Sequence, residues 1–136
     1  MPYRAAEMFT LVNDVESYAE FLPWCNRSEV LSRTDDAVEA LLELHKGAVS
    51  KTFTTRNTLK ANEAIHLELL GGPFRHLSGG WTFQRLGEAG SKVSLELEFE
   101  FESRIVDMMF GAFFEETCNS LVDAFARRAA DVYGQR

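Results

Sequence analysis

The sequence predicts an α+β fold in which a curved antiparallel β-sheet wraps around a long C-terminal α-helix. Three observations support this prediction: apolar residues alternate with a period of two between residues 28 and 101, they recur at helical spacing between 103 and 133, and short amphipathic segments precede the strands. Strands followed by a terminal helix are typical of a helix packed on one face of an antiparallel sheet. The length of 136 residues fits one domain, so we expect residues 1–136 to form a single domain.

Two short helices are expected before the strands. Apolar residues recur at helical spacing over residues 5–15, and this helix should end near Asn13 and Asp14. A second helix, at about residues 15–20, should end before Pro23, because the residue before a proline disfavours helical geometry.

The segment 93–102 is the clearest strand. One face carries Val93, Leu95, Leu97, Phe99 and Phe101, and the other carries Ser94, Glu96, Glu98, Glu100 and Glu102. This alternation predicts an antiparallel strand with one buried and one solvated face. Turn signals at residues 34–36, 61–63, 71–73 and 87–90 divide the region into about six short strands.

The segment 103–133 predicts one long helix, because it contains no proline and carries an apolar stripe. The stripe consists of Val106, Phe110, Phe113, Phe114, Thr117, Leu121, Ala124, Phe125 and Val132. At about 1.5 Å per residue the helix would be on the order of 45 Å long, enough to cross a small sheet.

The composition narrows the class of protein. There are 11 Phe but only 3 Tyr and 2 Trp, which indicates an interior built for apolar contact. The net charge of −7 disfavours unspecific DNA or RNA binding, which depends on neutralising phosphates. Cys25 and Cys118 match neither a zinc motif nor a disulfide framework. With no signal peptide and no membrane-spanning run apparent, we expect a soluble cytoplasmic protein.

Several short motifs, in their order and spacing, resemble one superfamily over essentially the whole chain. They are Pro2-Tyr3, residues 11–15 (LVNDV), Tyr18, residues 21–25 (FLPWC), residues 50–57 (SKTFTTRN), residues 72–74 (GPF), Gly80-Trp81 with Phe83, and residues 99–101 (FEF). The sequence is similar to the START-like (helix-grip, SRPBCC) superfamily. Within it, the chain resembles the polyketide cyclase and lipid transport branch that contains bacterial ribosome association toxin A and mitochondrial coenzyme Q-binding proteins.

The resemblance departs at the N-terminus. In this family a first β-strand precedes the Pro-Tyr motif, whereas here Met1 stands immediately before Pro2. With the first family strand apparently missing, we expect an unpaired sheet edge, which makes self-association possible.

The resemblance implies a cavity between sheet and helix that takes an apolar ligand. The main hypothesis is a non-catalytic protein that binds or transports ubiquinone or another isoprenoid lipid and supports respiration, with no cofactor required. The expected lining is Trp24, Phe53, Thr55, Phe74, Trp81, Phe83, Phe99, Phe101, Phe110, Phe113, Phe114, Thr117 and Leu121. Thr55, Thr117 and Asn57 would orient a head group. The alternative for any one Phe is ordinary core packing.

The second hypothesis is a ribosome association toxin that binds the large ribosomal subunit and blocks subunit joining. Between Leu44 and Asn62 the chain carries Lys46, Lys51, Arg56 and Lys60 and no acidic residue. Such a basic patch could contact RNA or a ribosomal protein. A solvated strand face, with Lys protecting a sheet edge, is the alternative.

Catalysis is poorly supported by the sequence. His45, His66 and His76 lack metal-ligand spacing, and the alternating Glu residues of 96–102 are most simply a solvated strand face. We therefore expect no enzyme, cyclase activity included, and no metal site.

Overall fold

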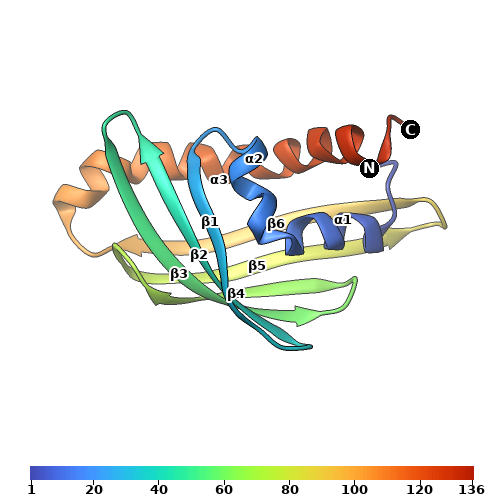
Figure 1. Ribbon diagram of the computed structural model, residues 1–136, viewed down its shortest axis with the longest axis horizontal. Coiled ribbons are helices and arrows are strands. Elements are labelled where there is room, and N and C mark those ends of the chain that lie inside the picture. Colours follow the sequence, from blue (N-terminus) through green and yellow to red (C-terminus); the bar gives the residue numbers. More distant parts are fainter.

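The computed structural model describes all residues 1–136 and confirms the α+β helix-grip architecture (Figure 1). The elements, in chain order, are α1 (Ala5–Asn13), the 3₁₀ turn η1 (Val15–Ser17), α2 (Tyr18–Phe21), β1 (Cys25–Arg33), β2 (Ala37–Lys46), β3 (Val49–Lys60), β4 (Ala64–Gly71), β5 (Phe74–Leu86), β6 (Gly90–Phe101) and α3 (Arg104–Tyr133). The expected second helix is thus a 3₁₀ turn followed by a single α-helical turn. No helix is long and apolar enough to cross a membrane.

The six strands form one antiparallel meander in the order β1-β2-β3-β4-β5-β6. In Figure 1 the strands β1–β3 run steeply across β4–β6, and α3 extends along the length of the sheet. Register shifts between Thr54 and Thr55 and between Phe74 and His76 interrupt the ladders, and such irregularities bend strands and increase their twist. The sheet is therefore curved enough to enclose one side of the helix.

Two glycines allow the central strands to approach closely. A Cβ atom on Gly79 would overlap the carbonyl oxygen of Glu96, and one on Gly80 would overlap the carbonyl oxygen of Ile65. Gly79 also has φ of +143°, which side-chain-bearing residues rarely adopt. Both positions therefore require glycine for β5 to pack between β4 and β6.

The outer edge of β6 is open, as the sequence predicts. The Met1 ammonium donates to the Ser91 carbonyl at 2.8 Å, and the Ser91 N–H donates to the Met1 carbonyl at 3.0 Å. This exchange is that of a hydrogen-bonded antiparallel pair. Past this single pair, β6 has no strand on that side.

The core consists of two hydrophobic clusters joined by α3. The first gathers α1, the short helices and the inner face of the sheet around Phe125 and Ala129, both fully buried. The second gathers Phe53, Phe74 and other strand residues around the N-terminal half of α3, including Phe110 and Phe114. The helix starts at a Ser103 cap, whose hydroxyl accepts from the Val106 N–H at 3.2 Å.

Candidate functional site

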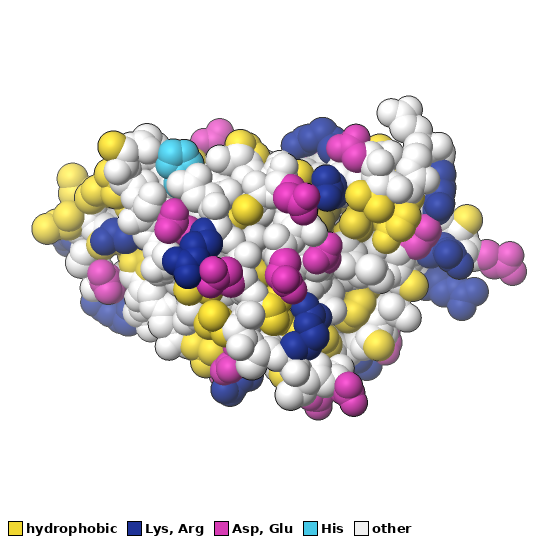
Figure 2. Space-filling view, viewed as in Figure 1, with side chains coloured by type: hydrophobic (Ala, Val, Ile, Leu, Met, Phe, Trp, Pro, Cys, Tyr) yellow, Lys and Arg dark blue, Asp and Glu magenta, His cyan; other side chains and the backbone are white.

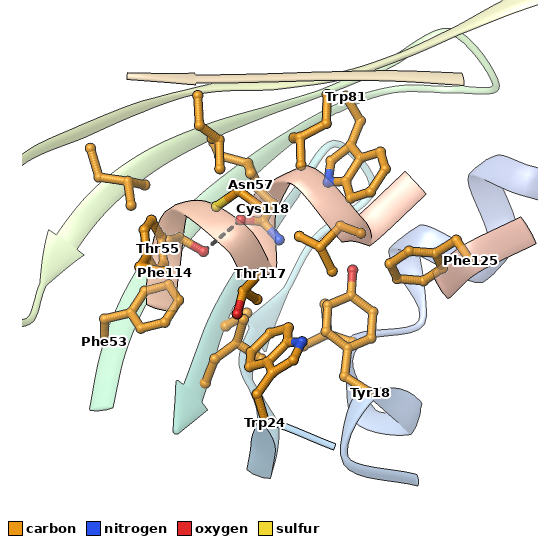
Figure 3. A pocket seen from close by; sticks show the side chains of 18 residues that line it. Tyr18, Trp24, Phe53, Thr55, Asn57, Trp81, Phe114, Thr117, Cys118 and Phe125 are labelled. Atoms are coloured by element: carbon orange, nitrogen blue, oxygen red, sulfur yellow. Dashed lines mark hydrogen bonds between the residues drawn. The ribbon is translucent and has the colours of Figure 1, made fainter. Parts of the chain in front are cut away.

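A cavity lies where the two hydrophobic clusters meet, between the inner face of the sheet and the middle of α3 (Figure 3). Its volume is about 80 Å³, and 15 of its 18 lining residues are hydrophobic. The lining consists of Val15, Tyr18, Trp24, Ala40, Leu42, Phe53, Thr55, Asn57, Leu67, Leu77, Trp81, Leu95, Leu97, Phe114, Thr117, Cys118, Leu121 and Phe125. Since ligand sites for drug-sized molecules usually measure about 300–1,000 Å³, this space fits only part of such a ligand.

The buried side chains of Thr55 and Asn57 give the cavity a polar wall on β3. Thr55 and Asn57 are adjacent inward positions of β3, and the Thr55 hydroxyl donates to Asn57 Oδ1 at 2.7 Å. Thr117 approaches the same region from α3 (Figure 3). Neither the Asn57 amide N–H groups nor the Thr117 hydroxyl has a side-chain partner in the structure, so they can hydrogen-bond to a molecule in the cavity.

Tyr18 and Cys118 are the lining residues that could ionise, and burial keeps both neutral. The Tyr18 hydroxyl donates to the Val12 carbonyl, and burial raises the pKa of this phenol above its usual value. Burial also raises the pKa of the Cys118 thiol to about 12, with Glu115 adding to the shift. The lining contains no carboxylate, His, Lys or Arg. It therefore provides no acid–base pair of the kind that proton-transfer chemistry uses.

None of the three histidines lines the cavity. His45, His66 and His76 are on β2, β4 and β5, and His66 and His76 are exposed to solvent. The structure contains no group of three or more His, Cys, Asp or Glu side chains that could hold a metal ion.

The structure places part of the predicted lining at the cavity. Those that line it are Trp24, Phe53, Thr55, Trp81, Phe114, Thr117 and Leu121, and Asn57 lies beside them. Phe74, Phe83, Phe99, Phe101, Phe110 and Phe113 do not, which corrects the sequence-based set.

The aromatic side chains outside the cavity are taken up by packing among themselves. Phe74, Phe101 and Phe110 belong to the second cluster, and the Phe74 and Phe101 rings stack at 4.9 Å. Phe83 packs edge-on against Phe9 at 5.5 Å, Phe99 packs against Phe114 at 4.8 Å, and Phe113 lies under the Lys46 ammonium at 5.9 Å. These six residues therefore pack against other side chains outside this cavity.

The sequence reasoning omitted the leucines that complete the cavity. Leu42, Leu67, Leu95 and Leu97 are on inward strand positions, and the period-two alternation already marks them as inward-facing. The emphasis on aromatic residues left them out. Leu77 is an inward position of β5 and Phe125 belongs to the apolar stripe of α3, whereas Tyr18 and Cys118 reach the cavity through tertiary packing, for which the local pattern carries no signal.

The four predicted basic residues do not share one face, which corrects the idea of a single patch. Lys46 and Lys51 are on the inner face of the β2–β3 hairpin near its turn, and Lys46 Nζ donates to the Met109 carbonyl at 3.3 Å. Arg56 and Lys60 are on the outer face of β3. There Arg56 pairs with Glu39 at 3.3 Å and Lys60 pairs with Glu63 at 3.7 Å, all at the surface.

Comparison with known proteins agrees with this architecture. The family model described as polyketide cyclase / dehydrase and lipid transport matches residues 1–126. Among solved structures, the Zhui aromatase/cyclase from Streptomyces sp. R1128 superposes with a TM-score of 0.82 at 21% identity, covering 99% of this chain and 93% of that one. At that identity the likeness shows the fold alone.

Curated relatives align over nearly the whole chain. The ribosome association toxin RatA of Vibrio cholerae is 47% identical over 133 residues, which cover 98% of this chain and 92% of that protein. RatA of Escherichia coli is 42% identical over 136 residues, covering 100% and 86%. The mitochondrial coenzyme Q-binding protein COQ10 homolog B of Xenopus laevis is 30% identical over 135 residues, covering 96% and 55%.

Proposed function

The chain belongs to the polyketide cyclase / dehydrase and lipid transport family, and from this premise we propose that it is a ribosome-associating protein of the toxin type. In this proposal it binds the large ribosomal subunit in the cytoplasm and hinders its joining with the small subunit. The observation that carries the proposal is identity of 42–47% to ribosome association toxins along essentially the full chain. This reverses the order of the two hypotheses drawn from the sequence.

The size of the cavity also favours ribosome association over quinone binding as the main function. A space of about 80 Å³ does not accommodate a quinone ring and its isoprenoid tail without movement of the surrounding elements. The relative named for coenzyme Q binding is also less similar, at 30% identity. A function exerted through the outer surface is therefore favoured over one that depends on a large internal site.

The outer face of β3 is the surface that we propose to meet the ribosome. Arg56 and Lys60 project from it, and their ion pairs with Glu39 and Glu63 are solvent-exposed. Exposed pairs of this kind contribute little, about 0–1 kcal/mol, so both cations can exchange their partners for phosphates or acidic side chains. The protein as a whole carries a charge of −7, so local cations would decide which face approaches RNA.

Co-sedimentation with purified large subunits tests this surface. We expect Arg56→Glu combined with Lys60→Glu to weaken binding by about tenfold or more, because two attractive charges become repulsive. Lys92→Glu, which changes an exposed side chain of β6, is the matched control and should bind like the parent protein. Equal binding of the double variant and the control would exclude the outer face of β3 as the contact.

The polar wall of the cavity supports a second candidate function, the binding of a small apolar molecule. We propose that such a molecule carries a hydrogen-bond acceptor, such as a carbonyl oxygen, because Asn57 and Thr117 offer unpaired donors. An isoprenoid quinone carries such an acceptor and is a candidate ligand if the cavity widens.

Organic extraction of the purified protein followed by mass spectrometry tests this second function. We expect an isoprenoid or other apolar carbonyl compound to co-purify with the parent protein and to be depleted at least several-fold from Asn57→Leu. Leu70→Ser, which changes an exposed side chain outside the cavity, is the control. Equal recovery from all three proteins would reject specific binding at this wall.

A further inference from the structure

One end of the molecule exposes an apolar surface that the proposed function does not use. Ile105, Met108 and Met109 follow one another at i, i+3 and i+4 in the first turns of α3, so they share one helix face. Their exposed fractions are 70%, 80% and 42%. Of the other exposed large hydrophobic residues, Leu31, Leu70 and Leu86 are on separate strands and Val132 is near the C-terminal end of α3, so they form no such run.

The turn of the β2–β3 hairpin extends this surface. Lys46 holds the hairpin to the helix, because its ammonium donates to the Met109 carbonyl and lies 5.9 Å from the Phe113 ring centre. Val49, 37% exposed, begins β3 just after the turn. We call Val49, Ile105, Met108 and Met109 the hairpin–helix tip. Figure 2 shows hydrophobic side chains gathered at the end of the molecule where α3 begins, with Lys or Arg side chains close by.

Three cations lie beside the hairpin–helix tip. Lys46 and Lys51 flank the hairpin turn, and Arg104 is the exposed first residue of α3. Asp107 is the acidic residue of the first helical turn. It is two residues from Ile105, about 200° around the helix, and therefore faces away from the apolar side. Glu102, also exposed, precedes the helix, and Glu115 and Glu116 follow Met108 and Met109 by seven residues, on the same side of the helix and about two turns away.

From this arrangement we propose that the hairpin–helix tip docks onto a phospholipid bilayer with anionic headgroups. Ile and Met side chains have no hydrogen-bonding tip, so they gain most from hydrocarbon, and apolar side chains flanked by Lys or Arg are typical of interfacial anchors. The long stems of Lys46 and Lys51 can remain in the interface while their ammonium groups reach lipid phosphates.

Other occupants fit this surface less well. Contacts to nucleic acid rely on aromatic side chains that stack on bases as well as on cationic groups, and the exposed side chains of the tip are aliphatic. A second copy docked through the same face would bring Lys46 and Lys51 against their own counterparts, where like charges repel. An anionic bilayer offers both hydrocarbon for the apolar side chains and negative charge for Lys46 and Lys51.

Vesicle flotation of the full chain tests the proposal. Two vesicle types are compared at about 0.1 M salt: phosphatidylcholine alone, and phosphatidylcholine mixed with phosphatidylglycerol. We expect binding to the mixed vesicles and at least about tenfold weaker binding to phosphatidylcholine alone. Met108→Ser combined with Met109→Ser should reduce binding to the mixed vesicles by about tenfold or more. Leu86→Ser, on an equally exposed residue at the opposite end of the sheet, should leave it unchanged.

The controls separate this proposal from the ribosomal one. Arg56→Glu, on the outer face of β3, should not change vesicle binding, and the double Met variant should still co-sediment with large subunits. Circular dichroism and thermal melting establish that each variant is folded. If no variant or parent protein floats, or if the double Met variant floats like Leu86→Ser, the proposal is overturned. Loss of large-subunit binding in the double Met variant, without any flotation of the parent, would instead assign the tip to the ribosome.

Discussion

At the scale of single residues, the Glu7 carboxylate ties the two chain ends together. It accepts hydrogen bonds from the Arg136 guanidinium at 2.7 Å and from the Arg4 backbone N–H at 2.9 Å. Nearby, the Tyr133 hydroxyl donates to the Glu7 carbonyl at 3.1 Å. The Arg136 hydrogen bond, followed by that from Arg4, lowers the pKa of Glu7 from 4.5 to about 2.

The lowered pKa predicts a pH dependence of stability. The folded state favours the ionised carboxylate, so its contribution is fully present above about pH 4.5 and is lost as the pH falls toward about 2. Glu7→Gln should therefore lower the free energy of unfolding at pH 7 and leave it unchanged near pH 2, as urea titrations at the two pH values would measure. Arg136→Ala should behave in the same way. A Glu7→Gln difference that does not change with pH would contradict this assignment.

Phe125 is the residue on which the first cluster depends most. It is fully buried, and its ring centre lies 5.3 Å from the ring centres of Tyr18, Phe21 and Trp81. We expect Phe125→Ala to destabilise the fold by about 3–5 kcal/mol in chemical denaturation. Phe113→Ala, a partly exposed residue of the same helix, is the comparison and should cost clearly less. Equal losses would contradict the central place of Phe125.

At the scale of elements, the close packing of β5 depends on its glycines. Because a Cβ on Gly80 would overlap the Ile65 carbonyl oxygen, Gly80→Ala must displace β4 or β5. We expect a loss of about 1–3 kcal/mol in the free energy of unfolding, measured by chemical denaturation. Gly47→Ala, at the open hairpin turn, meets no neighbouring atom and tests backbone strain alone, since its φ is +60°. Unchanged stability of Gly80→Ala would show that the strands are less closely packed.

The open edge of β6 bears on the predicted self-association. If two copies paired antiparallel through β6 with their outer faces aligned, Glu96, Glu98 and Glu100 of one copy would face glutamates of the other. Like charges directly opposite one another destabilise such pairs. Self-association through this edge therefore stays a prediction, and sedimentation velocity should show more dimer as salt rises and screens these charges.

Most of the elements could be predicted from sequence, because each depends on a local pattern. The alternation in 93–102 corresponds to β6, and the proline-free segment 103–133 corresponds to α3 at 104–133. The cavity could be predicted only in part. Inward alternation marks Phe53, Thr55 and Trp81 as facing the helix, but it does not decide which inward residues touch each other and which leave a space. That depends on the curvature of the sheet, which arises from register shifts and from Gly79 and Gly80.

The basic residues show the same limit. A period of two places Lys46 on the face of Leu44 and places Lys51 and Arg56 on opposite faces of β3, but the hairpin register decides that Lys51 shares the face of Leu44. The sequence shows four cations with no acidic residue between them. The fold places Lys46 and Lys51 on the inner face near the hairpin turn, and Arg56 and Lys60 on the outer face of β3. This division allows two surfaces to serve different partners.

At the scale of the whole molecule, three sites are separate: a small apolar cavity inside, cations on the outer face of β3, and the hairpin–helix tip at one end. A protein with a net negative charge and local groups of cations can present one face to a negatively charged partner without binding polyanions in general. The central claim is that this protein binds the large ribosomal subunit through the outer face of β3. It rests on relatives that are named for ribosome association and align along nearly the whole chain.

Sucrose-gradient sedimentation of purified ribosomal subunits, mixed with and without this protein, tests that claim most directly. The account predicts that the protein travels with the large subunit and that the peak of joined ribosomes falls as protein is added, while Arg56→Glu with Lys60→Glu restores the peak. A gradient in which the protein stays at the top and the joined peak is unchanged would contradict it.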